Sequence, residues 1–273
     1  MMNSSRHSDH LYGFAFSEIG SAHIAMGNNQ CEDSSLFQLL RSPKGKRYAL
    51  LITADGVGSC RYAKEASNEV VEAAGSMIIQ EIKEGFLPDR SMMKRAMETA
   101  EKSLICASER LKTPNTNELG TTLDIVLLDE NGKVLLVHNG DGSIILLHRS
   151  GAIETTAKMN APNGAVYTVD WLNAKNEHAW FIHESHNIAC VISATDGVYD
   201  YMTYAGIGLN TNFFEKTRLL DTWKTKAQLN KRAEQLIRNM CKSQLRITND
   251  DMTLAIAGFS RSTSIAAKRA GIQ

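Results

Sequence analysis

Acidic residues stand repeatedly at the borders of apolar runs that have the composition of β-strands. Asp55 and Asp196 each follow such a run and precede a glycine, and Asp200 comes four residues after Asp196. An Asp-Gly pair by itself is also common in turns. Repeated acidic residues at strand borders are stronger evidence for a functional site than one such pair. The whole set is Glu32, Asp33, Asp55, Asp141, Asp196, Asp250 and Asp251.

Carboxylates that gather at one end of packed strands repel one another unless a cation lies between them. Hard divalent cations take oxygen ligands of this kind, so the pattern predicts a site for Mg²⁺ or Mn²⁺. A zinc site is less favoured, because few histidines stand near these positions. His183 and His186 lack the helical i, i+4 spacing of a zinc protease motif and are interpreted as strand or surface residues.

The overall composition excludes some partners. Lys plus Arg and Asp plus Glu are equal at 30 each, which gives no general attraction to nucleic acid or to an anionic membrane. No apolar run approaches the roughly 18 residues of a membrane helix, and the polar start MMNSSRHSDH lacks the apolar segment of a secretory signal. The five cysteines are scattered without a C-x-x-C pair, which fits a reducing cytoplasm.

The first half of the chain alternates between strand and helix patterns. A long helical region is predicted over 61–86, and a second begins after Pro88 with apolar residues on one face, namely Met93, Ala96, Met97, Ala100, Leu104 and Ile105. Short strands are predicted at 11–20, 21–27, 34–40 and 47–54.

The second half begins with three apolar runs between residues 121 and 149. Each junction contains Asn-Gly, so an antiparallel meander is predicted, in which the segment NGDG could be a hairpin connection with no ligand. Residues 158–186 are poorly periodic and 203–222 are ambiguous. A strand at 190–195, a helix at 224–244 and a strand at 252–259 follow.

This order of elements favours an α+β architecture with helices outside antiparallel sheets. The chain shows no repeat and no Pro-rich linker, and it has only four prolines. A single domain over 1–273 is therefore predicted, with its core at about 13–258. The basic tail 260–273 could dock on a partner, but a frayed, solvated end is favoured.

Taken in order, six motifs resemble the metal-dependent serine/threonine protein phosphatases of type 2C, the PPM family. The resemblance spans roughly residues 13–258, and the segments 19–37 and 54–67 are most similar to a bacterial branch. It implies a four-layer α-β-β-α sandwich of two antiparallel sheets flanked by helix pairs. The motifs are Glu32-Asp33, Asp55-Gly56, Gly120-Thr121-Thr122, Gly140-Asp141-Gly142, Thr195-Asp196-Gly197 with Asp200, and Asp250-Asp251-Met252-Thr253.

The resemblance also implies roles for these residues around two Mg²⁺ or Mn²⁺ ions. A water molecule between the ions would be converted to hydroxide and attack the phosphoryl group in line. Asp55, Asp33 and Glu32 are the implied catalytic residues. Asp55 would bridge the two ions, and the remaining protein ligands would be the Gly56 carbonyl, Asp196 and Asp250. Asp33 and Glu32 would hold metal-bound water. A third ion could bind at Asp141, Asp196 and Asp200.

Some positions depart from the family pattern. Asn28 stands where many members carry an arginine that grips phosphate, which leaves His23 and Arg61 as candidates for substrate binding. His23 could equally be a neutral histidine packed in a strand, and Arg61 a surface residue at a helix start. Val57 replaces the histidine acid of some eukaryotic members, and Gly142-Ser143 replaces the usual Ser-Arg.

The expected function is dephosphorylation of phosphoserine or phosphothreonine in a phosphorylated protein, such as a Ser/Thr kinase or its target. Two alternatives stay open: a catalytically weak PPM-fold module that senses or binds a partner, and a hydrolase of small phosphate esters. Within the fold, residues 158–186 are the candidate for the flap that tunes substrate choice in this family.

Overall fold

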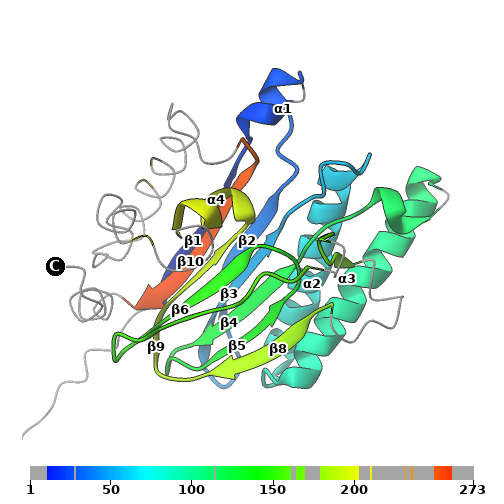
Figure 1. The fold of residues 1–273 in the computed structure, drawn as a ribbon. Coiled ribbons are helices and arrows are strands. Elements are labelled where there is room, and N and C mark those ends of the chain that lie inside the picture. The colour runs from blue at the N-terminus through cyan, green and yellow to red at the C-terminus, as the bar shows by residue number, and fades with distance from the viewer. Residues whose placement is uncertain are drawn as a thin grey trace, which may run out of the picture.

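The computed structural model describes residues 11–27, 29–113, 115–160, 164–169, 179–202, 210, 231, 235 and 249–259. Within these residues, two antiparallel sheets of five strands each pack face to face, and two long helices cover the outer face of one sheet (Figure 1). This arrangement confirms the predicted α+β sandwich.

The sheet beneath the long helices is buried on both faces. In β3, Leu50 and Ile52 pack toward the helices, whereas Ala49 and Leu51 pack toward the other sheet. Such alternation is what a strand between two apolar layers requires. In spatial order, the strands are β2 (Ser34–Arg41), β3 (Arg47–Ala54), β4 (Asp124–Asp129), β5 (Val134–His138) and β8 (Phe181–Ser185).

The covering helices are α2 (Ala63–Glu84) and α3 (Arg90–Leu111), close to their predicted bounds. Asp89 caps α3, since its side chain accepts a hydrogen bond of 2.7 Å from the backbone N–H of Met92. Ile105 was predicted on the buried face but is 38% exposed, because the buried stripe passes through its neighbour Leu104. A 3₁₀ helix, η1 (Thr116–Glu118), follows α3.

The second sheet packs one face on the first sheet and the other face on the short helix α4 (Asp196–Met202). In β10, Ala255 and Ala257 point toward the first sheet, whereas Leu254 and Ile256 join the cluster that contains Val198 of α4. In spatial order, the strands are β1 (Leu11–Glu18), β10 (Met252–Phe259), β9 (Ile188–Ala194), β6 (Ser143–His148) and β7 (Ile153–Thr155).

Several predicted segments lie outside the described residues. These are 203–222 except Asn210, the helix at 224–244 except Lys231 and Gln235, the tail 260–273, and most of 161–178 within the candidate flap. A helix layer was predicted on the outer face of the second sheet, and α4 is the part of that layer that the structure describes. Part of the poorly periodic region 158–186 forms β8, which pairs antiparallel with β5.

The predicted strand at 21–27 is wrong, because its residues begin the helix α1 (Ser21–Ala25). Long-range contacts decide this local structure. The backbone N–H of Ala22 donates to the carbonyl of Asn249 at 2.9 Å, and that of Gly20 donates to Asp251 Oδ1 at 2.5 Å. A five-residue segment is too short for its apolar spacing to distinguish helix from strand.

The predicted meander is correct at its first turn and wrong at its second. Strands β4 and β5 pair through the turn at Asn131-Gly132, but β6 belongs to the other sheet and pairs with β9 and β7. The segment NGDG therefore carries the chain from one sheet to the other. Gly140 suits this crossing, because its φ is +110° and a Cβ would lie 2.4 Å from Thr122 Cγ2.

In the described part of the chain, no helix is long and apolar enough to cross a bilayer. The four cysteines in this part, Cys31, Cys60, Cys106 and Cys190, are free thiols.

Candidate metal centre

Three of the predicted acidic residues meet at one end of the sandwich. Oxygen atoms of Asp55, Asp141 and Asp196 all lie within 4.8 Å of one another. Asp55 follows β3 of the first sheet, whereas Asp141 precedes β6 and Asp196 follows β9 of the second. The cluster thus joins the two sheets, and the crossing at NGDG is what brings Asp141 into it.

Two threonines hold the backbone of Asp55. Its N–H donates to Thr122 Oγ1 at 2.9 Å, and its carbonyl accepts from the Thr122 N–H at 2.9 Å and from Thr121 Oγ1 at 2.8 Å. Gly56 then forms an isolated bridge with Thr121, and a Cβ on Gly56 would lie 2.6 Å from the carbonyl oxygen of Ala63. The sequence pattern contained both threonines, but only the structure reveals that they position Asp55.

Asp33 lies beside this cluster in a fully buried position. Thr195 Oγ1 donates to Asp33 Oδ2 at 2.8 Å and accepts the backbone N–H of Thr253 at 3.0 Å, so the hydroxyl that follows β9 links the residue before β2 to β10. The carbonyl of Asp33 accepts from Lys64 Nζ at 2.8 Å. Burial, followed by the charge of Asp251, raises the pKa of Asp33 to about 8.

The two acids before β10 have different environments. Asp250 is exposed, and its Oδ1 accepts the backbone N–H of Asp251 at 2.9 Å. Asp250 is not one of the three clustered residues, but its charge contributes to the raised pKa values of Asp55 and Asp196. Asp251 is buried and accepts hydrogen bonds from the backbone N–H groups of Gly20 and Glu32. The sequence analysis assigned no role to Asp251. In the structure, its carboxylate binds the backbone at both Gly20 and Glu32.

The two candidates for substrate binding occupy different surroundings. His23 is buried in α1, with Nδ1 3.1 Å from Asp251 Oδ1 and Nε2 3.5 Å from Glu32 Oε2. Arg61 is exposed just before α2, and its guanidinium lies 5.3 Å from the centre of the Tyr62 ring. Asn28 lies outside the described residues.

Asp200, the last member of the predicted third-ion set, is paired with a lysine. Lys158 Nζ lies 3.3 Å from Asp200 Oδ1. The structure therefore brings Asp141 and Asp196 together with Asp55 and places Asp200 against a positive charge. At the neighbouring departure from the family pattern, a Cβ on Gly142 would lie 2.7 Å from the carbonyl oxygen of Ala194, so the crossing leaves room only for glycine.

The electrostatics of the cluster fit a divalent cation. Burial raises the pKa of Asp55, Asp141 and Asp196, to about 6 for Asp196, and the neighbouring carboxylates raise all three further. Asp196 Oδ1 is buried and has no hydrogen-bond partner in the described part of the chain. A cation with oxygen ligands would relieve the repulsion and satisfy that atom. The clustered side chains thus fit Mg²⁺ or Mn²⁺, which both prefer carboxylate ligands.

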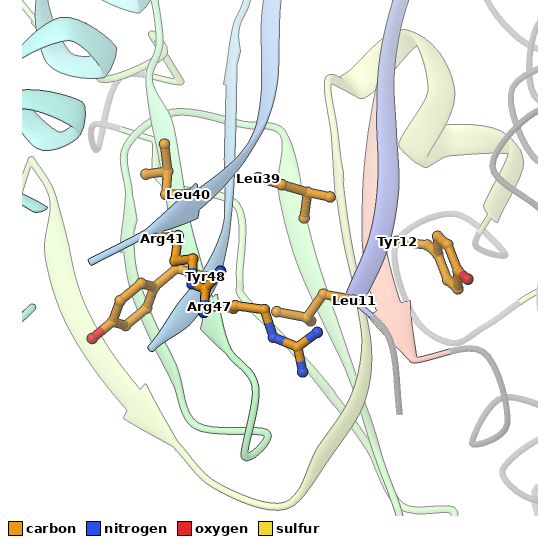
Figure 2. A pocket seen from close by; sticks show the side chains of 7 residues that line it. All are labelled: Leu11, Tyr12, Leu39, Leu40, Arg41, Arg47 and Tyr48. Atoms are coloured by element: carbon orange, nitrogen blue, oxygen red, sulfur yellow. The ribbon is translucent and has the colours of Figure 1, made fainter. Parts of the chain in front are cut away.

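A surface pocket lies away from this cluster. It occupies the opposite ends of β1, β2 and β3, as the strand register shows. Arg47 and Ala54 bound β3, so the pocket is roughly 23 Å from the acidic end at 3.3 Å per residue. Its lining residues are Leu11, Tyr12, Leu39, Leu40, Arg41, Arg47 and Tyr48 (Figure 2).

Comparisons with known proteins agree with the fold and the acidic cluster. The sequence profile described as protein phosphatase 2C matches residues 19–242, which is most of the chain. The chain therefore belongs to the protein phosphatase 2C family, whose members are metal-dependent. No curated protein sequence matches it.

Solved structures share this fold at low sequence identity. A bacterial serine phosphatase has a TM-score of 0.61 and 16% identity, covering 93% of this chain and 99% of the other. The serine/threonine phosphatase Stp1 from Staphylococcus aureus gives 0.59 and 16%, covering 93% and 98%. RsbX in complex with magnesium gives 0.56 and 15%, covering 92% and 96%. These similarities establish the fold.

Proposed function

We propose that this protein is a Mg²⁺- or Mn²⁺-dependent phosphatase that removes phosphate from phosphoserine or phosphothreonine in a cytoplasmic protein. The observation that carries the proposal is the convergence of Asp55, Asp141 and Asp196 within 4.8 Å at one end of the sandwich. Family membership and a magnesium complex of the similarly folded RsbX give it further support.

In this proposal, two divalent ions would be held by Asp55, the Gly56 carbonyl, Asp196 and Asp250. Bound ions of this kind acidify a water molecule and offset the negative charge of the phosphoryl oxygens. Residues around the predicted ligands keep those ligands in position. Thr121 and Thr122 fix the backbone of Asp55 through three hydrogen bonds of 2.8 to 2.9 Å.

Asp33 and Glu32 form the second group of catalytic residues in this proposal. Thr195 orients the Asp33 carboxyl with its hydroxyl, and Asp251 holds the backbone of Glu32. In the metal-free protein, burial raises the pKa of Asp33 to about 8, whereas a bound cation would favour its ionised carboxylate. Both residues would then orient water molecules around the ions.

Substrate binding is assigned to one of the two predicted cations. Arg61 is exposed and follows the loop that begins at Asp55, so it is free of burial costs and can approach a phosphoryl group. His23 is enclosed between Asp251 and Glu32, which favours a role in positioning Glu32. The partner is a phosphorylated protein, for which a Ser/Thr kinase or its target is the natural candidate.

The test is phosphatase activity on an aryl phosphate with Mn²⁺, with Mg²⁺ and with a chelator. We expect activity only with metal, and we expect Asp55→Ala and Asp196→Ala to abolish it. Asp129→Ala is the matched control, because Asp129 also lies at a strand end but pairs with Lys46 at 2.8 Å, far from the cluster. Full activity in chelator, or normal rates in both variants, would reject the proposal.

A second comparison decides the substrate class. We expect faster hydrolysis of a phosphothreonine peptide than of a phosphotyrosine peptide or of small phosphate esters. A preference for small esters would indicate a different substrate class at the same centre. Inactivity on every substrate, combined with binding to a partner protein, would favour a role as an interaction module.

A further inference from the structure

A lysine lies beside the acidic cluster on the side of Asp200. Lys158 Nζ is 3.3 Å from Asp200 Oδ1, and the ammonium group also lies 5.7 Å from the centre of the Tyr199 ring. The carboxylate of Asp200 is therefore already paired with a positive charge of the chain itself.

Hydrogen bonds on both sides of Lys158 fix its place in the chain. The backbone N–H of Met159 donates to the carbonyl of Gly140 at 2.7 Å, within the segment that crosses between the sheets. The carbonyl of Ala157 accepts from Nε2 of His138 at 2.9 Å, and Nδ1 of that ring lies 2.7 Å from Asp124 Oδ1. A lysine anchored through both neighbours is held next to Asp141 more firmly than a surface lysine on a free loop.

The resemblance to the phosphatase family implies a site for a third ion at Asp141, Asp196 and Asp200. The structure divides that set, because Asp141 and Asp196 lie with Asp55 whereas Asp200 faces Lys158. A third divalent ion at this place would have to displace the ammonium group from Asp200 or lie next to it. Displacement would break the Lys158–Asp200 ion pair, and an ion next to the ammonium group would be repelled by it.

We propose that Lys158 takes the place of a third metal ion, so that the chain binds two divalent ions and its own ammonium group neutralises Asp200. This inference rests on the proposed function, because it assumes a two-ion centre. It differs from the family expectation in a specific way. A tethered cation is present at every metal concentration, whereas a weakly bound third ion would be lost when the concentration falls.

The test counts bound Mn²⁺ by equilibrium dialysis with elemental analysis, and by native mass spectrometry, on the full chain. We expect the native protein to bind two ions and Lys158→Ala to bind a third, weaker one. Lys158→Arg should bind two, since it keeps the positive charge. The double variant Lys158→Ala/Asp200→Asn should also bind two, because it lacks the carboxylate that the third ion needs.

Lys133→Ala is the matched control. Lys133 Nζ lies 2.9 Å from Glu184 Oε1, and the two side chains are 38% and 35% exposed, compared with 34% and 38% for Lys158 and Asp200. This variant should bind two ions. Circular dichroism checks the fold of each variant, and Lys158→Gln replaces Lys158→Ala if the latter does not fold.

The outcomes separate this inference from the proposed function. Three ions in the native protein, or two in the folded variant that lacks the lysine charge, would overturn the inference and leave the two-ion phosphatase intact. A native protein that binds no Mn²⁺ and hydrolyses no phosphate ester would overturn the proposed function and the inference with it. Two ions in the native protein and a third that appears only without the lysine charge support the inference.

Discussion

The first sheet has acidic side chains at both of its ends, and their surroundings differ. At the end of β4, Asp129 Oδ1 accepts the backbone N–H groups of Asn131 and Lys133, each at 2.9 Å, and Oδ2 lies 2.8 Å from Lys46 Nζ. After β3, at the opposite end, Asp55 lies against other carboxylates. The chain itself satisfies Asp129, which therefore stabilises a turn. The cluster around Asp55 opposes folding until a cation binds.

The largest effects are expected from substitutions at these two ends, which should change the stability of the metal-free protein in opposite directions. Asp55→Asn should lower metal-dependent activity on the order of 10³-fold, because a ligand carboxylate is lost. In chelator the same change should stabilise the fold, since it removes one of several repelling charges. Asp129→Ala should do the opposite, with unchanged activity and a loss of about 2 kcal/mol from two hydrogen bonds.

Urea denaturation in chelator measures both stability changes, and activity is normalised to folded protein. The comparison fails if Asp55→Asn destabilises the metal-free protein as much as Asp129→Ala does. That result would mean that Asp55 has a structural partner rather than a cluster of like charges.

The same contrast explains which parts of the structure could be predicted from the sequence. Asn131-Gly132 and Asn139-Gly140 carry the same turn signal, but the first joins two paired strands and the second crosses between sheets. A turn signal reports local backbone conformation, whereas the choice of pairing partner depends on strands distant in sequence. The acidic positions could be predicted because strand ends and turn residues are local features.

Other parts depended on distant partners and could not be predicted in this way. The helix α1 replaces a predicted strand because Gly20 and Ala22 bond to residues near 250, more than 200 positions away. The role of Thr195 could not be predicted either, because its hydroxyl joins Asp33 to the start of β10. The order of the motifs predicted that Thr195 and Asp33 lie near the site, but it did not indicate that Thr195 orients Asp33.

A smaller effect is expected where the chain positions a ligand without contributing one. Thr122→Val keeps the shape of the side chain but leaves the backbone N–H of Asp55 without its 2.9 Å acceptor. Affinity for Mn²⁺ should fall by about 10–100-fold, which is typical when a residue that orients a ligand is removed. Titration of the metal-free protein with Mn²⁺ measures the affinity directly.

Thr99→Val is the matched control for that variant. Thr99 Oγ1 donates to the carbonyl of Arg95 at 2.7 Å on α3, away from the cluster. It should leave Mn²⁺ affinity unchanged. An equal loss in both variants would indicate a general loss of stability rather than a specific role for Thr122.

The pH dependence of the metal-free protein tests the acidic end of the sheet without any substitution. The pKa of Asp33 is raised from 3.8 to about 8 and that of Asp196 to about 6, mainly by burial. Between about pH 4 and 8 the folded state therefore holds protons that the unfolded state has released, so stability decreases as pH rises. In chelator, Tm should therefore fall steadily from pH 5 to pH 8. Saturating Mn²⁺ should reduce this decrease, because the ion takes over the role of the protons. A metal-free Tm that rises over this range would show that these carboxyls lose their protons more easily in the folded state, contrary to the clustering of charge at this end of the sandwich.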